Sequence, residues 1–378
     1  MKFVLAPDSF KESMTAKVAA EAMEKGIKEV FPEAECIIVP MADGGEGTVE
    51  SLVDGSNGVI VQKEVTGPLG NKVIAEYGLL GDGKTAVIEM ASASGLHLVL
   101  PEQRNPLITT TYGTGELIRD ALEHGITRIL IGIGGSATND GGVGMLQALG
   151  ASFRDKNGKE LPFGGGALHN LESIDLKRMD SRLSSINIEV ACDVTNPLIG
   201  KNGASFIFGP QKGATEKMVK LLDENLSHYA KKIKDFTGMD IAEKEGAGAA
   251  GGLGAGLLVF LNAEIKRGID LVIEYTDLEN KLDGTNFVFT GEGSIDGQTL
   301  FGKTPFGVAK LAKKHHIPVI AFAGRVGSGV EELYHHGFTA VIGILKEVTS
   351  IEAALMSGRE NLQFATENVC RIIKNKII

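Results

Sequence analysis

Apolar runs that break into glycine-rich loops recur along the chain, and segments with helical spacing follow them. Residues 2–6 are expected to form a buried strand, and residues 16–31 a helix whose apolar positions recur every three or four residues. Residues 36–39 predict a second strand, after which the loop MADGGEGT leads into another helix. This repeated order of strand, loop and helix predicts a parallel sheet that carries ligand-binding loops at the carboxyl ends of its strands.

The pattern changes after about residue 58 and returns to its first form near residue 286. In between, three short segments joined by tight turns predict antiparallel strands, at 59–65, 73–80 and 85–90. Strands and helices then alternate again, at 286–290, 305–315, 318–323, 340–345 and 351–374. We therefore expect an α/β protein in which both chain ends, 1–62 and 258–378, build one parallel-sheet domain, while residues 63–257 form an inserted mixed α/β domain.

The segment GAGAAGGLGAG, residues 246–256, admits two interpretations. Its low complexity is typical of a linker or hinge. It also runs straight into the apolar sequence LLVFL, which fits the start of a closely packed helix made of small residues. The sequence leaves both interpretations open.

Glycine is unusually common, with 50 of 378 residues, or about 13% against an average of about 7%. It clusters after apolar runs without a fixed period, which indicates functional loops. The net charge of −10 argues against nucleic acid or an anionic membrane as a partner. Three widely spaced cysteines, no signal-peptide pattern and no apolar run of about 18 residues lead us to expect a cytoplasmic protein.

The segment IGIGGSATNDGG, residues 131–142, is the strongest candidate for an anion-binding loop. It follows an apolar run and precedes a helix-forming stretch, so its backbone N–H groups and the helix N-terminus favour a negatively charged ligand. The loop can contact a ligand through the backbone amides of Gly134 and Gly135 and the hydroxyl of Ser136. Asn139 adds a side-chain amide and Asp140 a carboxylate. The structural alternative is a simple glycine turn.

Two loops near the start of the chain carry polar groups directly after strands. In APDSFK, Asp8 and Ser9 are placed to bind a polar substrate, and Lys11 can neutralise a phosphate. In MADGGEGT, Asp43 lies between glycines near a helix N-terminus, where a carboxylate can ligate Mg²⁺ or cap the helix. A turn with a solvated lysine is the alternative for the first loop.

Two later strands also end in charged residues. Asp193, in ACDVTNPL, can act as a general base toward a substrate hydroxyl, or it can cap the turn before Pro197. Arg325, in AFAGRV, can hold a carboxylate with two parallel hydrogen bonds, or it can be an ordinary surface arginine.

The segment TGEGSIDGQTLFGKTP contains a formal match to the P-loop pattern, GQTLFGKT at 297–304. A P-loop follows its strand at once, whereas the strand here is expected to end near Thr290, and Pro305 places the helix start after the Lys-Thr pair. We therefore favour an anion-binding loop of another geometry, with Lys303 as its charge.

Seven motifs in this order resemble the type-1 glycerate kinase family: APDSFK, MADGGEGT, GGSATNDGG, ACDVTNPL, FGPQKGA, TGEGSIDGQTLFGK and AFAGRV. They span nearly the whole chain. The resemblance implies a flavodoxin-like domain with a second domain inserted into it, and no P-loop. It also implies ATP-dependent phosphorylation of (R)-glycerate in organic-acid metabolism, to 2-phosphoglycerate in most bacterial members and otherwise to 3-phosphoglycerate.

Chemistry and position then assign a role to each candidate residue. The catalytic group comprises Asp193 as general base, with Lys11 and Lys303 stabilising the transferring phosphoryl group. Nucleotide binding is assigned to Gly134, Gly135, Ser136, Asn139, Gly291, Gly293 and Ser294. Glycerate binding is assigned to Asp8, Ser9 and Arg325, and Mg²⁺ binding to Asp43 and Asp140.

Two other function classes remain compatible with these loops. One is a phosphotransferase for another small hydroxy acid or polyol, and the other is a non-catalytic nucleotide-binding protein. The sequence also leaves open which hydroxyl is phosphorylated and whether the protein is a monomer or a homodimer.

Overall fold

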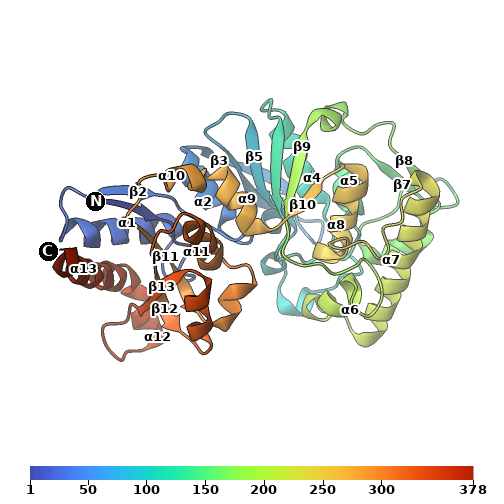
Figure 1. The fold of residues 1–378 in the computed structure, drawn as a ribbon. Coiled ribbons are helices and arrows are strands. Elements are labelled where there is room, and N and C mark those ends of the chain that lie inside the picture. The colour runs from blue at the N-terminus through green and yellow to red at the C-terminus, as the bar shows by residue number, and fades with distance from the viewer. Residues whose placement is uncertain (378) are drawn as a thin grey trace. The chain divides into compact units, whose positions relative to one another are not determined.

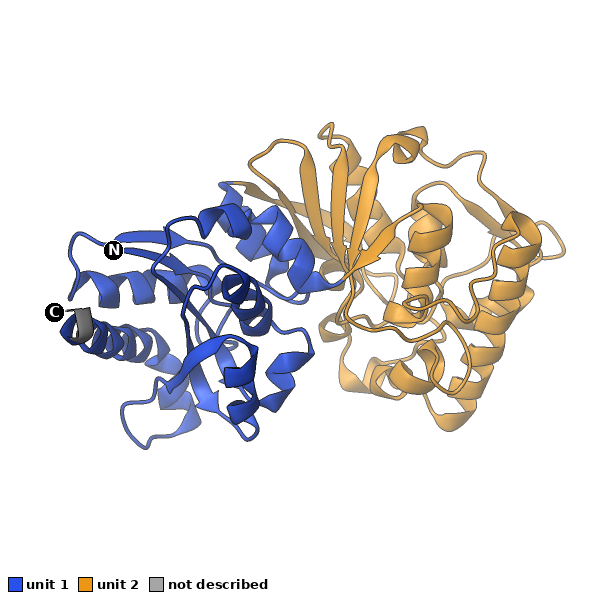
Figure 2. Ribbon diagram, viewed as in Figure 1, with its two compact units in different colours: residues 1–57, 267–378 blue, residues 58–266 orange. Residues whose placement is uncertain are grey.

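The computed structural model describes residues 1–377, which divide into two compact units (Figures 1 and 2). Unit 1 joins Met1–Asn57 to the residues from Arg267 onward, and unit 2 is Gly58–Lys266. The boundaries expected from the sequence, after residues 62 and 257, fall inside a strand and a helix of unit 2. Those elements continue the fold of unit 2 without a break, so unit 2 begins five residues earlier and ends nine residues later than expected.

Unit 1 is built on a five-stranded sheet in which every neighbouring pair is parallel. Its strands are β1 (Lys2–Leu5), β2 (Glu35–Ile38), β11 (Phe287–Ile295), β12 (Val319–Val326) and β13 (Phe338–Gly343). Across the sheet they lie in the order β2-β1-β11-β12-β13. Counted along unit 1 this is 2-1-3-4-5, the flavodoxin-like order, so the expected fold of the two chain ends is confirmed.

Helices cover both faces of this sheet. They are α1 (Ala16–Lys28), α2 (Thr48–Ser56), α9 (Gly268–Tyr275), α10 (Leu278–Lys281), α11 (Thr304–Lys314), α12 (Ile351–Met356) and α13 (Gly358–Ile377). Helices α1 and α13 pack side by side (Figure 1) and form one core with Phe3, Leu5 and Phe289. Val4, buried but outside that core, faces the opposite side by strand alternation. Helix α11 packs against β11 and β12.

Unit 2 is built on a mixed six-stranded sheet in the order β10-β9-β6-β5-β4-β3. Its strands are β3 (Val59–Thr66), β4 (Lys72–Leu79), β5 (Thr85–Glu89), β6 (Arg128–Gly132), β9 (Asn187–Ala191) and β10 (Glu264–Lys266). Strand β4 pairs antiparallel with both β3 and β5, as the short spacing of these strands predicted. From β5 onward, the pairs β5–β6, β6–β9 and β9–β10 are parallel. A separate hairpin joins β7 (Ser152–Arg154) to β8 (Ser173–Asp175).

The helices of unit 2 are α3 (Ala91–Ser94), α4 (Tyr112–Leu122), α5 (Val143–Ala148), α6 (Ala204–Phe208), α7 (Glu216–Thr237) and α8 (Ala249–Phe260). Helix α8 decides between the two interpretations of the glycine-rich segment. Gly251 has φ +68°, and a Cβ there would lie 2.0 Å from the carbonyl oxygen of Thr138. The segment is therefore closely packed against the loop after β6, and the linker interpretation is wrong.

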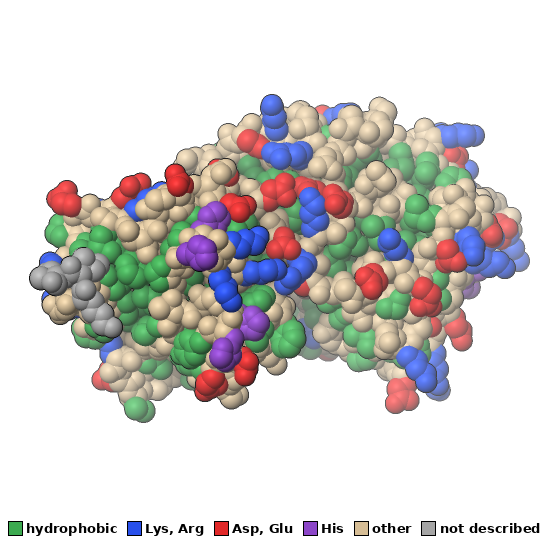
Figure 3. Space-filling view, in the orientation of Figure 1, with side chains coloured by type: hydrophobic (Ala, Val, Ile, Leu, Met, Phe, Trp, Pro, Cys, Tyr) green, Lys and Arg blue, Asp and Glu red, His purple; other side chains and the backbone are tan. Residues whose placement is uncertain are grey.

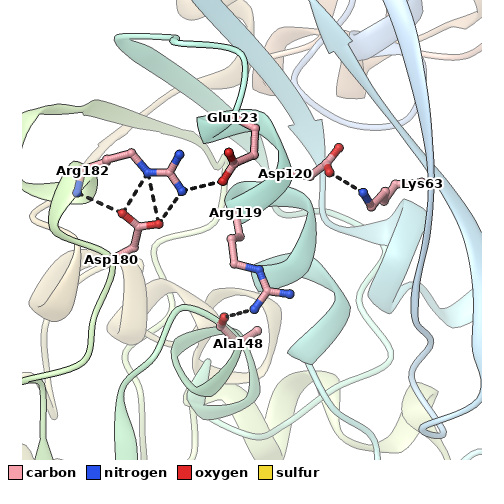
Figure 4. A network of polar contacts seen from close by, with 7 residues as sticks. All are labelled: Lys63, Arg119, Asp120, Glu123, Ala148, Asp180 and Arg182. Carbon is pink, nitrogen blue, oxygen red and sulfur yellow. Dashed lines mark hydrogen bonds and ion pairs between the residues drawn. The ribbon is translucent and has the colours of Figure 1, made fainter.

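A network of ion pairs on unit 2 connects helix α4 with its neighbours (Figure 4). Lys63 of β3 pairs with Asp120 at 2.6 Å, and Arg182 pairs with Asp180 at 2.6 Å and with Glu123 at 2.8 Å. Figure 3 shows charges of both signs interspersed over the visible face, so the net charge of −10 is not gathered there. Water and salt screen ion pairs at the surface, so these pairs add little to the stability of the unit.

Within residues 1–377, no helix is both long enough and apolar enough to cross a membrane.

Candidate active site

A cavity of about 680 Å³ in unit 1 opens where β1, β11 and β12 end. Strand order in a flavodoxin-like sheet reverses between its first and third strands, here β1 and β11, and ligands bind in the crevice beside that point. Eight of the residues selected from the sequence line the cavity: Asp8, Ser9, Lys11, Asp43, Gly293, Ser294, Lys303 and Arg325. The rule that ligand loops follow parallel strands therefore brings residues up to 317 positions apart into one pocket.

Asp8 is held rigidly at the end of β1. Its backbone N–H donates to the carbonyl of Gly291 at 2.8 Å, which continues the β1–β11 ladder. One carboxylate oxygen accepts from the Ser9 amide at 2.6 Å, and the other accepts from the Thr304 hydroxyl at 2.5 Å. Burial raises the pKa of Asp8 to about 6, against the effect of the Thr304 hydrogen bond, and the charge of Asp43 adds to the rise.

Glu292 is a pocket residue that the sequence did not single out. It lies in β11, its Oε2 is 3.4 Å from Nζ of Lys303, and its Oε1 accepts from the Thr299 hydroxyl at 3.2 Å. Burial raises its pKa to about 7, although the charge of Lys303 opposes the rise. A carboxyl group that titrates near neutral pH in a pocket is a functional-site feature.

The Glu292→Gln variant is expected to be more stable than wild type above pH 7. A carboxyl whose folded pKa is raised stabilises the fold below its unfolded pKa and loses that contribution as pH rises through about 7. Glutamine is neutral throughout, so we expect a melting temperature about 2–4 °C higher at pH 8. Thermal unfolding of the apoprotein from pH 5 to 8 measures this, with exposed Glu331→Gln as the control. Parallel pH profiles for wild type and Glu292→Gln would contradict the prediction.

Strand β11 runs further than expected. Its ladder with β12 continues through Ser294–Arg325 and Ile295–Val326, so the expected end near Thr290 is wrong. Gly291 is consequently a packed strand residue, because a Cβ there would lie 2.4 Å from the Phe322 carbonyl. It does not line the cavity, unlike Gly293 and Ser294. Nucleotide binding is therefore no longer assigned to Gly291.

The extended β11 also changes the argument against a P-loop. The GQTLFGKT segment now follows its strand closely, but residues Gly297–Phe301 form a 3₁₀ turn. Its N–H groups are used within the protein: Gly297 donates to the Ser328 carbonyl at 3.0 Å, and Gln298 to the Asp296 carboxylate at 2.9 Å. An anion cradle needs these donors free. The segment thus lacks P-loop geometry for a reason that the sequence did not reveal.

Lys11 and Arg325 supply exposed positive charge beside these carboxyl groups. Both line the cavity, and neither forms an ion pair with a described residue. Asp43 does not cap helix α2: its Oδ1 accepts from the Gly45 amide at 3.0 Å, and Gly47 precedes the helix. The pocket therefore combines free cations with carboxylates, which suits an anionic ligand and a divalent cation.

In unit 2, the loop after β6 and the residue after β9 occupy neighbouring strand ends. Gly132 and Ala191 are register partners, so the exposed Gly134 and Asp193 follow adjacent parallel strands. Asp140 is fully buried and accepts from Thr111 N at 2.8 Å, Thr111 Oγ1 at 2.9 Å, Gly142 N at 3.2 Å and Gly144 N at 3.3 Å. Its carboxylate is thus occupied in shaping the loop, and we no longer assign Mg²⁺ to it.

Asn139 and Ser136, also assigned to nucleotide binding, are buried as well. Asn139 donates from its amide to Ser205 at 3.0 Å, so it fastens the loop to α6. Ser136 accepts from Lys212 at 2.7 Å. Lys212 was missed in the sequence because the segment FGPQKGA has the composition of a surface turn, in which a lysine is expected to be solvated. Its place in one of the seven motifs is the only feature of the sequence that hints at a functional role.

The fold is that of an α/β protein, and its cavity carries cationic side chains that suit a small anionic ligand. The sequence model of the Glycerate kinase family matches residues 3–374. The chain is 54% identical to "Glycerate kinase" of Bacillus subtilis strain 168, covering 99% of this chain and 98% of the relative. It is 54% identical to "Glycerate 2-kinase" of Escherichia coli K12, covering 98% and 97%.

A solved structure agrees with these relatives. The crystal structure of a Salmonella typhimurium LT2 protein provisionally named glycerate kinase 2 superposes with a TM-score of 0.92 at 50% identity, covering 100% of this chain and 99% of the other. The chain therefore belongs to the glycerate kinase family, and it is a kinase. The resemblance carried by the seven motifs is confirmed.

Proposed function

We propose that the protein transfers the γ-phosphoryl group of ATP to the 2-hydroxyl of (R)-glycerate, giving ADP and 2-phosphoglycerate. The relatives named glycerate kinase and glycerate 2-kinase support the substrate and the product. The structural observation that carries the proposal is one pocket with three cationic side chains, Lys11, Lys303 and Arg325. Both substrates are anions, so a protein with net charge −10 needs such a local cluster.

The pocket residues divide by chemistry into those that act on phosphate and those that act on carboxylate. Phosphoryl transfer requires positioning and charge neutralisation more than covalent chemistry. Lys303, positioned by Glu292, and Lys11 neutralise the transferring phosphoryl oxygens. Arg325, with its planar guanidinium, holds the glycerate carboxylate through two hydrogen bonds, while Ser9 orients its hydroxyls.

The carboxylates Asp8 and Asp43 fit a Mg²⁺ ion. The charge of Asp43 raises the pKa of Asp8, so the two groups lie close enough to repel, and a divalent cation relieves that repulsion. Among the described residues no cluster of three or more His, Cys, Asp or Glu side chains could hold a metal. Mg²⁺ needs only one or two carboxylates when water and phosphates complete its shell. When bound, it would neutralise phosphate oxygens of ATP.

The proposal assigns two further roles to residues of unit 2. The exposed Asp193 accepts the proton of the glycerate hydroxyl that attacks phosphorus. The loop Gly134–Ser136 binds phosphate oxygens of the nucleotide through backbone N–H groups.

Product analysis tests the function. ADP release should be fast with (R)-glycerate and at least about tenfold slower with lactate, glycerol and tartronate semialdehyde, because each lacks a group that the pocket binds. Phosphorus NMR should place the new phosphate on C2 of glycerate. Phosphate on C3 would overturn the product assignment. Faster turnover of glycerol or lactate would favour a different phosphotransferase, and ATP binding without turnover would favour a non-catalytic protein.

Arg325→Ala is expected to raise KM for glycerate about 10- to 100-fold, because a charge-assisted hydrogen bond to the carboxylate is lost. Since this contact is made equally in the ground and transition states, kcat should stay near the wild-type value. Steady-state kinetics with varied glycerate measure the split, and exposed Arg359→Ala, which does not line the cavity, is the matched control. An unchanged KM in Arg325→Ala would exclude the carboxylate clamp.

A further inference from the structure

Lys212 is a lysine buried inside unit 2. Its side chain is 1% exposed, and it ends the 3₁₀ turn Pro210–Lys212 that follows helix α6. Its Nζ donates to Ser136 Oγ at 2.7 Å and to the Thr138 carbonyl at 2.6 Å. Both acceptors belong to the loop after β6, more than 70 residues away in the sequence. Burying an ammonium group costs free energy unless hydrogen bonds and an opposite charge compensate it.

The loop above Lys212 presents unused donors. Among the residues that the structure describes, no acceptor is present for the backbone N–H groups of Gly134, Gly135 and Ser136, although Gly135 itself accepts from Leu96 at 2.8 Å. Gly134 and Gly135 are exposed. Three successive N–H groups without a protein acceptor are a donor set of the kind that binds anions. This observation is independent of Lys212 and points to the same ligand.

The Ser136 hydroxyl connects Lys212 with the loop that carries the free N–H groups. It accepts from Lys212, so its own proton is free to point outward to a ligand. A chain from ammonium to hydroxyl to anion polarises each hydrogen bond in it, and the low dielectric around a buried charge strengthens the effect.

Among the described residues, Asp140 is the charged group that acts on Lys212. Burial lowers the pKa of Lys212 to about 7, and the charge of Asp140 opposes that lowering. Asp140 is already occupied by four donors from Thr111, Gly142 and Gly144. Asp140 therefore compensates the ammonium group only in part, and an anion above Ser136 would add further negative charge.

We propose that Lys212 is the buried counter-charge of a phosphate site formed by Gly134, Gly135 and Ser136, and that phosphate binding and protonation of Lys212 are coupled. Lys212 acts through Ser136 and the loop backbone, so it is a positioning residue and does not itself touch the ligand. The ligand is a phosphate oxyanion of the nucleotide or of the phosphorylated product. The inference rests on the proposed function, because that function supplies these phosphates.

The coupling has a definite sign. An anion favours the charged form of Lys212, so binding takes up a proton wherever free Lys212 is partly neutral, that is, above pH 7. Affinity for the phosphate ligand is therefore full below pH 7 and falls as pH rises further. The second ionisation of such phosphate groups has a pKa of about 6 and is nearly complete at pH 8, so measurements at pH 8 isolate the lysine.

Calorimetry on the full-length protein at pH 8 tests the proposal, with ADP and 2-phosphoglycerate as separate ligands and buffers of different ionisation enthalpy. We expect a fraction of a proton to be taken up by wild type. Lys212→Met should weaken binding about 10- to 100-fold and abolish uptake. Lys212→Arg, which stays charged, should restore binding without uptake. Ser136→Ala should weaken binding while keeping the fold, and exposed Lys217→Met should match wild type.

The outcomes separate this inference from the proposed function. The ligand that causes uptake in wild type, and not in Lys212→Arg, identifies which phosphate occupies the loop. Binding of both ligands by wild type without proton uptake and without weakening between pH 7 and 9 would overturn the role of Lys212, even if glycerate is phosphorylated normally. That result needs no variant, so a folding defect in Lys212→Met cannot obscure it. Absence of turnover with glycerate would instead contradict the proposed function.

Discussion

Replacement of Lys303 by methionine is expected to lower kcat for glycerate phosphorylation about 10²- to 10³-fold, the loss typical of one preorganised group that stabilises transition-state charge. Lys303 Nζ lies 3.4 Å from Glu292 Oε2, and its side chain is 34% exposed. It is therefore anchored on one side and open to the cavity on the other. Methionine keeps most of the apolar stem of lysine, one atom shorter, and removes the charged ammonium group with its donors.

Glu292 makes the Lys303 prediction sharper. Without Lys303, burial and the charge of Asp8 would push the pKa of Glu292 above about 7. Glu292 would then be protonated at neutral pH, and Lys303→Met should leave the fold intact. The double variant Lys303→Met/Glu292→Gln should have the same kcat as Lys303→Met, because Glu292 acts by positioning the lysine.

Single-turnover and steady-state kinetics measure the effect of Lys303→Met, and Lys310→Met is the matched control. Lys310 is an exposed lysine of the same helix region, α11, and it does not line the cavity. A kcat for Lys303→Met within about threefold of wild type, with normal thermal unfolding, would remove Lys303 from the catalytic group.

The sequence predicted which candidate residues share a cavity better than it predicted the contacts that support them. Strand ends are recognisable because an apolar run gives way to glycines and charges, and parallel topology gathers such ends at one edge. That rule was enough to bring Asp8, Lys303 and Arg325 to one cavity of unit 1. It needs only the order of elements, which local patterns determine.

Strand β11 shows where the local pattern fails. Its second half, Gly291–Ile295, contains two glycines and a glutamate, and these residues have low strand propensity. Pairing with β12 keeps it extended nonetheless, since a central strand is stabilised by its neighbour and not by its own side chains. Glu292 was missed for this reason: in a loop it is an ordinary polar residue, whereas in a central strand it is half-buried and faces Lys303.

Asp140 and Lys212 show that the roles of buried charged residues are hard to predict from a sequence alone. From the sequence, Asp140 is a polar residue without an evident partner and a possible metal ligand; in the structure Thr111, 29 residues earlier, binds it with two donors. Lys212 is buried by contacts to Ser136 and Thr138, 76 and 74 residues earlier. Contacts over such separations leave no periodic trace in a single sequence, so these two roles required the structure.

Asp193 is proposed as the general base of the reaction, so Asp193→Asn is expected to lower kcat about 10²- to 10⁴-fold. Asparagine keeps the shape of aspartate and cannot accept the hydroxyl proton. KM for ATP should change little, because Asp193 is assigned to the attacking hydroxyl alone. Exposed Asp235→Asn, in the same unit, is the matched control and should behave as wild type.

The structure adds Asp8 as a second candidate for the general base. Burial raises the pKa of Asp8 to about 6, so the carboxylate is ionised at neutral pH and still basic enough to accept a proton. The two assignments differ in what each variant changes. If Asp193 is the base and Asp8 helps to hold Mg²⁺, Asp8→Asn raises the Mg²⁺ concentration needed for half-maximal rate, and saturating Mg²⁺ restores much of kcat. If Asp8 is the base, saturating Mg²⁺ does not restore kcat in Asp8→Asn, and kcat/KM of that variant no longer rises with pH through about 6. In that case Asp193→Asn keeps a near-wild-type kcat. Measuring both variants across pH and Mg²⁺ concentration therefore assigns the proton acceptor to one carboxylate.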